Sequence, residues 1–358
     1  MFTSYRRILL APGALRMSLA ALIARLPMAM AELGIVLLVT GATGRYELAG
    51  AISAAYIVAS AAMAILQGRL LDRLGQPLVL SVASLGFGGS MTLMVVSVQA
   101  SWPLLTTFAF AATGGALMPQ IGSAIRARWS HLLDQATGLH TAFALEAVLD
   151  EALFIAGPIL ATALATAWHP AAGIAVAIAA CVAGTLACSA QPSTAPPPRP
   201  REAATGPAMP WRTVLPLAVV FAALGVLFGA AEITTVAFAE EHGNKAAAGW
   251  LLAVWAAGSL AAGLATGAIG WRHGPARRVR WGAVAMTAAM VPLCFVGSLP
   301  VMGAVLLIGG VSIAPTMIAG TSLTEAMVPA SRLTEGMAIM HTGLLGGVAP
   351  GAAFSGMV

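Results

Sequence analysis

Long apolar runs, separated by short polar connections, make up almost all of this chain. About eleven runs are long enough to cross ~30 Å of hydrocarbon, which takes ~20 residues in a helix. They cover residues 14–40, 48–66, 77–98, 103–125, 136–166, 171–190, 213–239, 246–269, 281–298, 300–323 and 335–357. Of the 358 residues only 9% are charged and 59% are hydrophobic, whereas soluble domains carry about 25% charge. The composition excludes a soluble enzyme, a nucleic-acid-binding protein and a disordered chain. It predicts an all-α polytopic membrane protein, because a barrel needs shorter strands.

Basic residues lie in alternate connections between these runs. If the N-terminus is cytoplasmic, the inner connections hold fifteen arginines, whereas the outer ones hold only Arg45 and Lys245. Cytoplasmic loops generally carry such an excess of Lys and Arg, so we expect a multi-pass protein with its N-terminus inside. The net charge of +5 then reflects topology and gives no reason to expect a nucleic-acid partner. Abundant Ala and a strong preference for Arg over Lys suggest a bacterial source, and hence the bacterial plasma membrane.

One connection is long, and it divides the chain. Residues 191–212 are rich in proline and polar residues, which is typical of a linker. Six runs precede it in residues 1–190 and five follow it in residues 213–358. We therefore expect two helical bundles joined by a cytoplasmic linker. If the bundles are equivalent, a twelfth helix is missing, and the chain would be a fragment.

The two halves also share a pattern of residues, which suggests an internal duplication. A glutamate preceded by alanine is followed at nearly the same intervals by three glycines: Glu32, Gly50, Gly68 and Gly75 in the first half, and Glu232, Gly249, Gly267 and Gly274 in the second. Six spans per copy give both halves the same orientation, as in a parallel repeat about an axis normal to the membrane.

The connection after the second run carries a recognisable motif. Residues 68–76 read Gly-Arg-Leu-Leu-Asp-Arg-Leu-Gly-Gln. This resembles the signature loop of the major facilitator superfamily, Gly-x-x-x-Asp-Arg-x-Gly followed by Arg or Lys, and departs from it only at Gln76. The resemblance implies two six-helix bundles that transport by alternating access. It also implies a gating loop formed by Gly68, Asp72, Arg73 and Gly75; the alternative is a charged turn that only sets topology.

Ionisable residues inside the first and seventh runs are candidates for the transport site. Burying a charge in a membrane helix costs at least ~2.5–3.5 kcal/mol, so such residues are seldom retained without a use. Arg25 and Glu32 are seven residues apart and share a helical face, with Pro27 between them as a potential kink. By the resemblance, Glu32 and Glu232 would face each other across a central cavity and bind protons or a cationic substrate. Alternatively, each is neutralised by a neighbouring helix.

The fifth run carries three more acids. Glu146 and Asp150 lie one turn apart on one face, and Glu151 follows directly. Arg25 is the expected counter-ion for Glu146 or Asp150, which leaves structural and proton-coupling roles equally open. Gly157-Pro158, a predicted hinge, resembles part of the signature of the antiporter branch, although the flanking glycines are mostly absent.

These features predict a secondary transporter rather than an enzyme. No nucleotide-binding loop of the Walker type is present, so we expect no cofactor and a proton gradient as the energy source. No metal site is expected either, because the three cysteines lie in apolar runs without ligand-type neighbours. We expect export of small amphipathic or cationic compounds by a monomer. The alternatives are proton symport of a small metabolite and a truncated remnant that does not transport.

Overall fold

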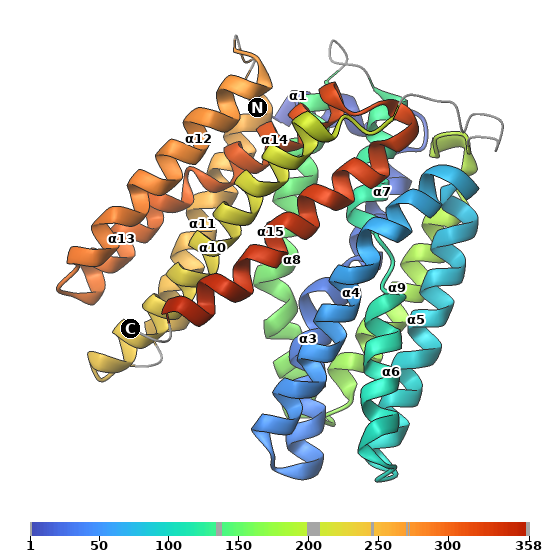
Figure 1. Ribbon diagram of the computed structural model, residues 1–358, viewed down its shortest axis with the longest axis vertical. Coiled ribbons are helices and arrows are strands. Elements are labelled where there is room, and N and C mark those ends of the chain that lie inside the picture. Colours follow the sequence, from blue (N-terminus) through green and yellow to red (C-terminus); the bar gives the residue numbers. More distant parts are fainter. Residues whose placement is uncertain are drawn as a thin grey trace. The chain divides into compact units, whose positions relative to one another are not determined.

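The computed structural model describes residues 2–133, 138–198, 208–244, 247–269, 271 and 273–355. Over these residues the regular structure is entirely helical (Figure 1). The α-helices are α1 (Phe2–Leu9), α2 (Ala14–Ala24), α3 (Leu26–Thr43), α4 (Tyr46–Leu74), α5 (Gln76–Gln99), α6 (Leu104–Ala116), α7 (Ile121–Leu132), α8 (Leu139–Ala167), α9 (Ala172–Ser189), α10 (Trp211–Glu241), α11 (Ala247–Ala268), α12 (Pro275–Met290), α13 (Leu299–Gly310), α14 (Ile313–Met327) and α15 (Leu333–Ser355).

Helices occupy the place of every predicted span, which confirms the predicted fold class. Within the described residues, nine stretches are long and apolar enough to cross a membrane. Three of them consist of two consecutive helices: α2 with α3, α6 with α7, and α13 with α14. The other two predicted spans correspond to α12 and α15.

The chain packs as two compact units. Unit 1 comprises Met1–Ile8, Leu133–Glu151 and Pro207–Val358, and unit 2 comprises Leu9–Leu132 and Ala152–Gly206. Helix α8 therefore contributes its first half to unit 1 and its second half to unit 2. Part of the predicted linker, residues 199–207, lies outside the described residues, and the division predicted there stays a prediction.

Glycines let helices α10 and α15 of unit 1 approach each other closely. Gly225 and Gly229 on α10 face α15, and Gly343, Gly347 and Gly351 on α15 face α10. A methyl group at any of the five would press into the backbone of the opposite helix. Small residues have this role in membranes because helix association there depends on close packing rather than on the hydrophobic effect. This interface is the main helix contact of α15.

Unit 2 also has close helix crossings at glycines, and these surround a core of larger side chains. Phe87 and Met91 on α5 are fully buried among residues of α3, α4, α6 and α9. Gly115 brings α6 against the backbone of α4 at Tyr56, and Gly184 brings α9 against the junction of α2 and α3 at Ala24. Small residues at the crossings and large ones between them give this unit its core.

The glycine interface of unit 1 yields a test with a matched control on the same helix. We expect Gly347→Ala to destabilise the protein by about 1–3 kcal/mol, the usual cost of overpacking, because the new methyl group meets the carbonyl of Ala222. The neighbouring Gly346→Ala places its methyl group in open space and should be neutral or stabilising, since alanine favours a helix over glycine. Thermal unfolding of the two variants in detergent would measure the difference. Equal unfolding temperatures would contradict the proposed packing.

Candidate functional site

The first predicted span is broken at its buried arginine. Helix α2 ends at Ala24 and α3 begins at Leu26, with Pro27 in the first turn of α3. Proline lacks the N–H that would continue the helical ladder, so the helix is interrupted next to the residue that the sequence marks as a potential kink. Arg25 occupies the junction with only 1% of its surface exposed, and its Nε donates a hydrogen bond to the carbonyl of Ala21 at 3.1 Å.

The two repeat-related glutamates have matching environments in their own units. Glu32 on α3 and Glu232 on α10 are both exposed, and the alanine before each, Ala31 or Ala231, is buried. Glu32 also lies close enough to Tyr56 on α4 to interact with it electrostatically. Because Glu32 belongs to unit 2 and Glu232 to unit 1, their predicted approach across a cavity stays a prediction.

The three acids in the first half of α8 differ in burial. Glu146 is fully buried, while Asp150 and Glu151 are half-buried. Glu151 is adjacent to Ser259 on α11. The predicted pairing of Arg25 with Glu146 or Asp150 would join residues of different units and stays a prediction.

The C-terminal end of α11 is capped by side chains that are distant in sequence. Tyr5 Oη donates to the carbonyl of Leu264 at 3.0 Å, and Thr141 Oγ1 donates to that of Gly267 at 2.8 Å. His140 Nε2 donates to a third carbonyl of the last turn, at 3.0 Å. The last carbonyls of a helix have no partners within it, so α1 and α8 satisfy the end of α11 inside unit 1. Gly267 permits this approach, since a methyl group there would overlap the hydroxyl of Tyr5.

The predicted gating loop is the turn between α4 and α5. Gly75 has φ +89° and is both the last cap of α4 and the first cap of α5. This left-handed conformation favours glycine, so the predicted tight turn is confirmed at this residue. Gly68 is buried in α4, Asp72 is half-buried, and Arg73 is exposed. The gating role of these residues stays a prediction.

A buried arginine explains why this loop ends in glutamine. Arg128 on α7 is fully buried, and its Nε donates to Gln76 Oε1 at 2.7 Å. Its Nη1 donates to the carbonyls of Cys188 and Gln191 at 3.0 and 3.2 Å, and to Thr194 Oγ1 at 2.7 Å. Arg128 therefore ties the signature loop to the end of α9. A lysine or arginine in place of Gln76 would bring a second positive charge against it.

Sequence reasoning did not single out Arg128. It lies just beyond the predicted run 103–125, where it counted as one of many cytoplasmic charges. The one signal in the sequence was Gln76, where the family pattern has Arg or Lys. A neutral residue at this position is compatible with a basic residue from another part of the chain beside it.

The predicted hinge in α8 is not a break in the helix. The helix continues through Pro158 from Leu139 to Ala167. Gly157 lies against α3, where a methyl group would overlap Ala29. Gly157 therefore allows a close helix crossing, and the hinge role of Gly157 and Pro158 stays a prediction.

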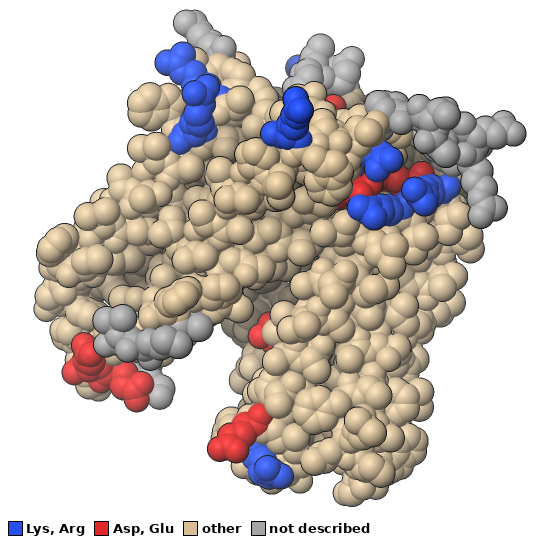
Figure 2. All heavy atoms as spheres, in the orientation of Figure 1, with Lys and Arg blue, Asp and Glu red and all other residues tan. Residues whose placement is uncertain are grey.

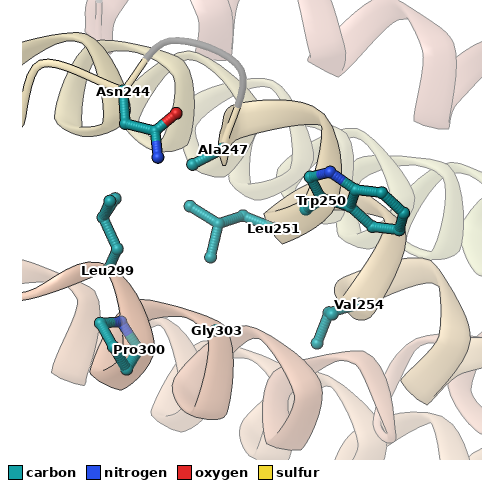
Figure 3. Close-up of a pocket in the computed structure, with 8 residues that line it drawn as sticks. All are labelled: Asn244, Ala247, Trp250, Leu251, Val254, Leu299, Pro300 and Gly303. Atoms are coloured by element: carbon teal, nitrogen blue, oxygen red, sulfur yellow. The ribbon is translucent and has the colours of Figure 1, made fainter.

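Two apolar pockets lie at helix ends, away from the acids on α8. The pocket in unit 1 measures about 380 Å³ (Figure 3). Its lining comprises Asn244, Ala247, Trp250, Leu251, Val254, Leu299, Pro300 and Gly303. A second, of about 330 Å³, lies in unit 2 beside Thr40 and Tyr46. None of the described residues lining the first is ionisable, so it offers no counter-charge for a cation.

The distribution of charge agrees with a membrane location. In Figure 2 the sides of the helices are almost uniformly uncharged, and most charged side chains gather at helix ends. The described residues contain no group of three or more His, Cys, Asp or Glu placed to hold a metal ion.

Comparison with known proteins identifies the family. Residues 10–243 match the Major Facilitator Superfamily. The fold is similar to that of the human organic anion transporter MFSD10 (TETRAN), with a TM-score of 0.72, 15% identity, and coverage of 98% of this chain and 93% of that one. A bacterial homologue of the iron transporter ferroportin in an outward-facing state gives a TM-score of 0.74 at 13% identity, covering 96% and 91%. The transporter FucP in its outward conformation gives 0.68 at 14%, covering 96% and 92%. No curated protein sequence matches the chain.

The match extends over more than half of the chain, so this protein belongs to the Major Facilitator Superfamily. The structural likenesses, all at low identity, show the fold. With the apolar helices, they define a multi-pass membrane protein with the fold of a transporter.

The contact between Gln76 and Arg128 can be tested by changing charge at one position. We expect Gln76→Lys to destabilise the protein by roughly 3 kcal/mol, because it leaves two buried like charges without compensation. Gln76→Glu should cost less, since a carboxylate there accepts the same hydrogen bond and pairs with Arg128, and it loses only the bond that Gln76 Nε2 donates to the carbonyl of Ala124 at 3.1 Å. Thermal unfolding of both variants in detergent would separate them. A Gln76→Lys protein as stable as Gln76→Glu would contradict the assigned environment.

Proposed function

We propose that this protein is a secondary active transporter that exports small amphipathic or cationic compounds in exchange for protons. The observation that carries the proposal is the set of carboxylates within membrane-spanning helices: Glu32 on α3, Glu232 on α10, and Glu146, Asp150 and Glu151 on α8. The fold provides alternating access, and these acids provide groups that can bind a proton or a cation.

The exposure of Glu32 and Glu232 supports a role in a water-filled cavity. An exposed carboxylate midway along a spanning helix faces either lipid or water, and lipid costs ~2.5–3.5 kcal/mol or more. Both glutamates follow a buried alanine at the same place in the repeat. Duplicated exposure of this kind favours an aqueous path beside each glutamate.

The acids of α8 support proton coupling from a second position. Glu146 is fully buried and Glu151 lies beside Ser259. Both acids lie within the membrane-spanning helix α8, where ionisable groups are candidates for proton relays. Arg25, buried at the break in the first span, is the proposed counter-ion for one of them.

Export rather than uptake rests on one sequence feature, the Gly157-Pro158 pair of α8. The named substrates of the similar structures, an organic anion and iron, differ from each other, and one fold serves many chemistries. The acids in the spans favour a cationic cargo. We further propose a monomer in a bacterial plasma membrane with its N-terminus in the cytoplasm.

Proton release from vesicles tests the proposal. Inside-out vesicles containing the protein would be acidified, and a pH-sensitive dye would report proton release when lipophilic cations or neutral antibiotics are added. We expect release with the wild type and its loss in Glu32→Gln and Glu232→Gln, because an amide cannot carry the proton. Glu47→Gln is the matched control: Glu47 is an exposed acid at the start of α4 and should behave like the wild type.

Other outcomes would revise specific parts of the proposal. If both glutamate variants respond like the wild type, coupling does not depend on Glu32 and Glu232, and Glu146→Gln and Glu151→Gln become the decisive variants. If no compound releases protons, proton-coupled export is wrong. Uptake in right-side-out vesicles would then distinguish symport from a chain that does not transport.

A further inference from the structure

The start of α12 carries a concentration of positive charge. Arg277, Arg278 and Arg280 lie in the first two turns of α12. The sequence contains no acidic residue between Glu241 and Glu325. Among the described residues, none of the three arginines forms an ion pair, whereas Arg332 pairs with Glu335 at the start of α15, at 3.4 Å. None of these three positive charges is therefore neutralised by an ion pair within the described residues.

The ring of Trp271 positions one of these arginines. Trp271 Nε1 donates to the carbonyl of Thr266 at 3.1 Å, which fixes the ring at the end of α11. The guanidinium of Arg278 lies over that ring, 4.4 Å from its centroid. Arg278 is half-buried and its Nη2 is buried without a hydrogen-bond partner among the described residues. Burial lowers the pKa of Arg278 to about 10, so it remains charged at neutral pH.

The other two arginines point outward together with the second tryptophan. Arg277 and Arg280 are exposed, and Trp281 has 64% of its surface exposed. Residues three and four apart share one side of a helix, so all three lie on one face of α12. In Figure 2 basic side chains gather at the end of unit 1 where α12 begins. Tryptophan prefers the headgroup level of a bilayer, which places this face at the level of lipid phosphates.

From these contacts we infer that the start of α12 is a binding site for the headgroup of an anionic phospholipid of the inner leaflet. Arg277 and Arg280 contact the phosphate oxygens. Arg278, which lies over the ring of Trp271, donates a further hydrogen bond to the phosphate from its Nη2. The indole of Trp281 packs along the upper acyl chain. The first-turn N–H groups of α12, which no side chain caps, add further partial positive charge.

The arginines of α12 differ from basic loop residues that only determine the orientation of a protein in the membrane. A topological signal needs only the number of basic residues in a loop. Here one guanidinium is held on an aromatic ring that is itself hydrogen-bonded, so part of the side-chain entropy has been lost before any ligand binds. Preorganisation of this kind increases affinity, and the choice of lipid should therefore depend on these particular residues.

Native mass spectrometry of the purified protein in a neutral detergent would test the site. The protein would be titrated with phosphatidylglycerol and, separately, with phosphatidylcholine. We expect preferential binding of phosphatidylglycerol by the wild type. In Arg277→Gln/Arg278→Gln/Arg280→Gln, the affinity of the tightest phosphatidylglycerol site should fall by roughly 100-fold, from the usual contribution of basic residues at anionic membranes.

A matched variant separates a specific site from general electrostatics. Arg16→Gln/Arg45→Gln/Arg212→Gln removes the same number of charges from exposed residues elsewhere in the chain, and its affinity should stay within about twofold of the wild type, as expected for charges outside the site. Trp271→Leu, which keeps every arginine, should weaken binding by severalfold. Equal losses in the two triple variants, equal binding of both lipids, or competition by inorganic phosphate alone would each overturn the proposal. Thermal unfolding of every variant would confirm that it is folded.

Discussion

The absence of water in a bilayer is the constraint on which the rest of this structure depends. No lipid tail accepts or donates a hydrogen bond, so every backbone polar group in the hydrocarbon must find its partner inside the protein. Helices satisfy this requirement within one segment, and the described chain is helical wherever it is apolar. Helix packing then depends on how closely backbones can approach, which explains the glycines between α10 and α15 and those at the crossings of unit 2.

Helix ends are the places where the backbone ladder stops, and this protein uses them to join distant segments. Tyr5, His140 and Thr141 satisfy the last carbonyls of α11. Arg128 satisfies carbonyls at and beyond the end of α9 and also holds the turn between α4 and α5. These contacts have directions as well as partners, so they define how the segments fit, which apolar packing alone specifies less sharply.

The charged residues divide by location into two kinds of role. Those midway along the spanning helices are few, and the proposed transport chemistry depends on the acids among them and on Arg25. Those at helix ends are mostly arginines, among which Arg128 binds carbonyls at the end of a helix and the arginines of α12 are proposed to bind lipid. Arg128 and Arg278 belong to the second kind, yet both are held in place by specific partners.

Sequence alone determined the fold class, the positions of the spans, the break at Pro27 and the turn at Gly75, because each follows from local properties: apolar length, a missing N–H, and a left-handed conformation. It also drew attention to Glu32 and Glu232 through the repeat. Only the tertiary structure decided that Arg128 explains Gln76, that Gly157 serves a helix crossing, and that the end of α11 is capped by α1 and α8. Those features join residues far apart in the chain, and their partners cannot be assigned from spacing, since hydrogen bonds and close packing depend on which helix faces meet.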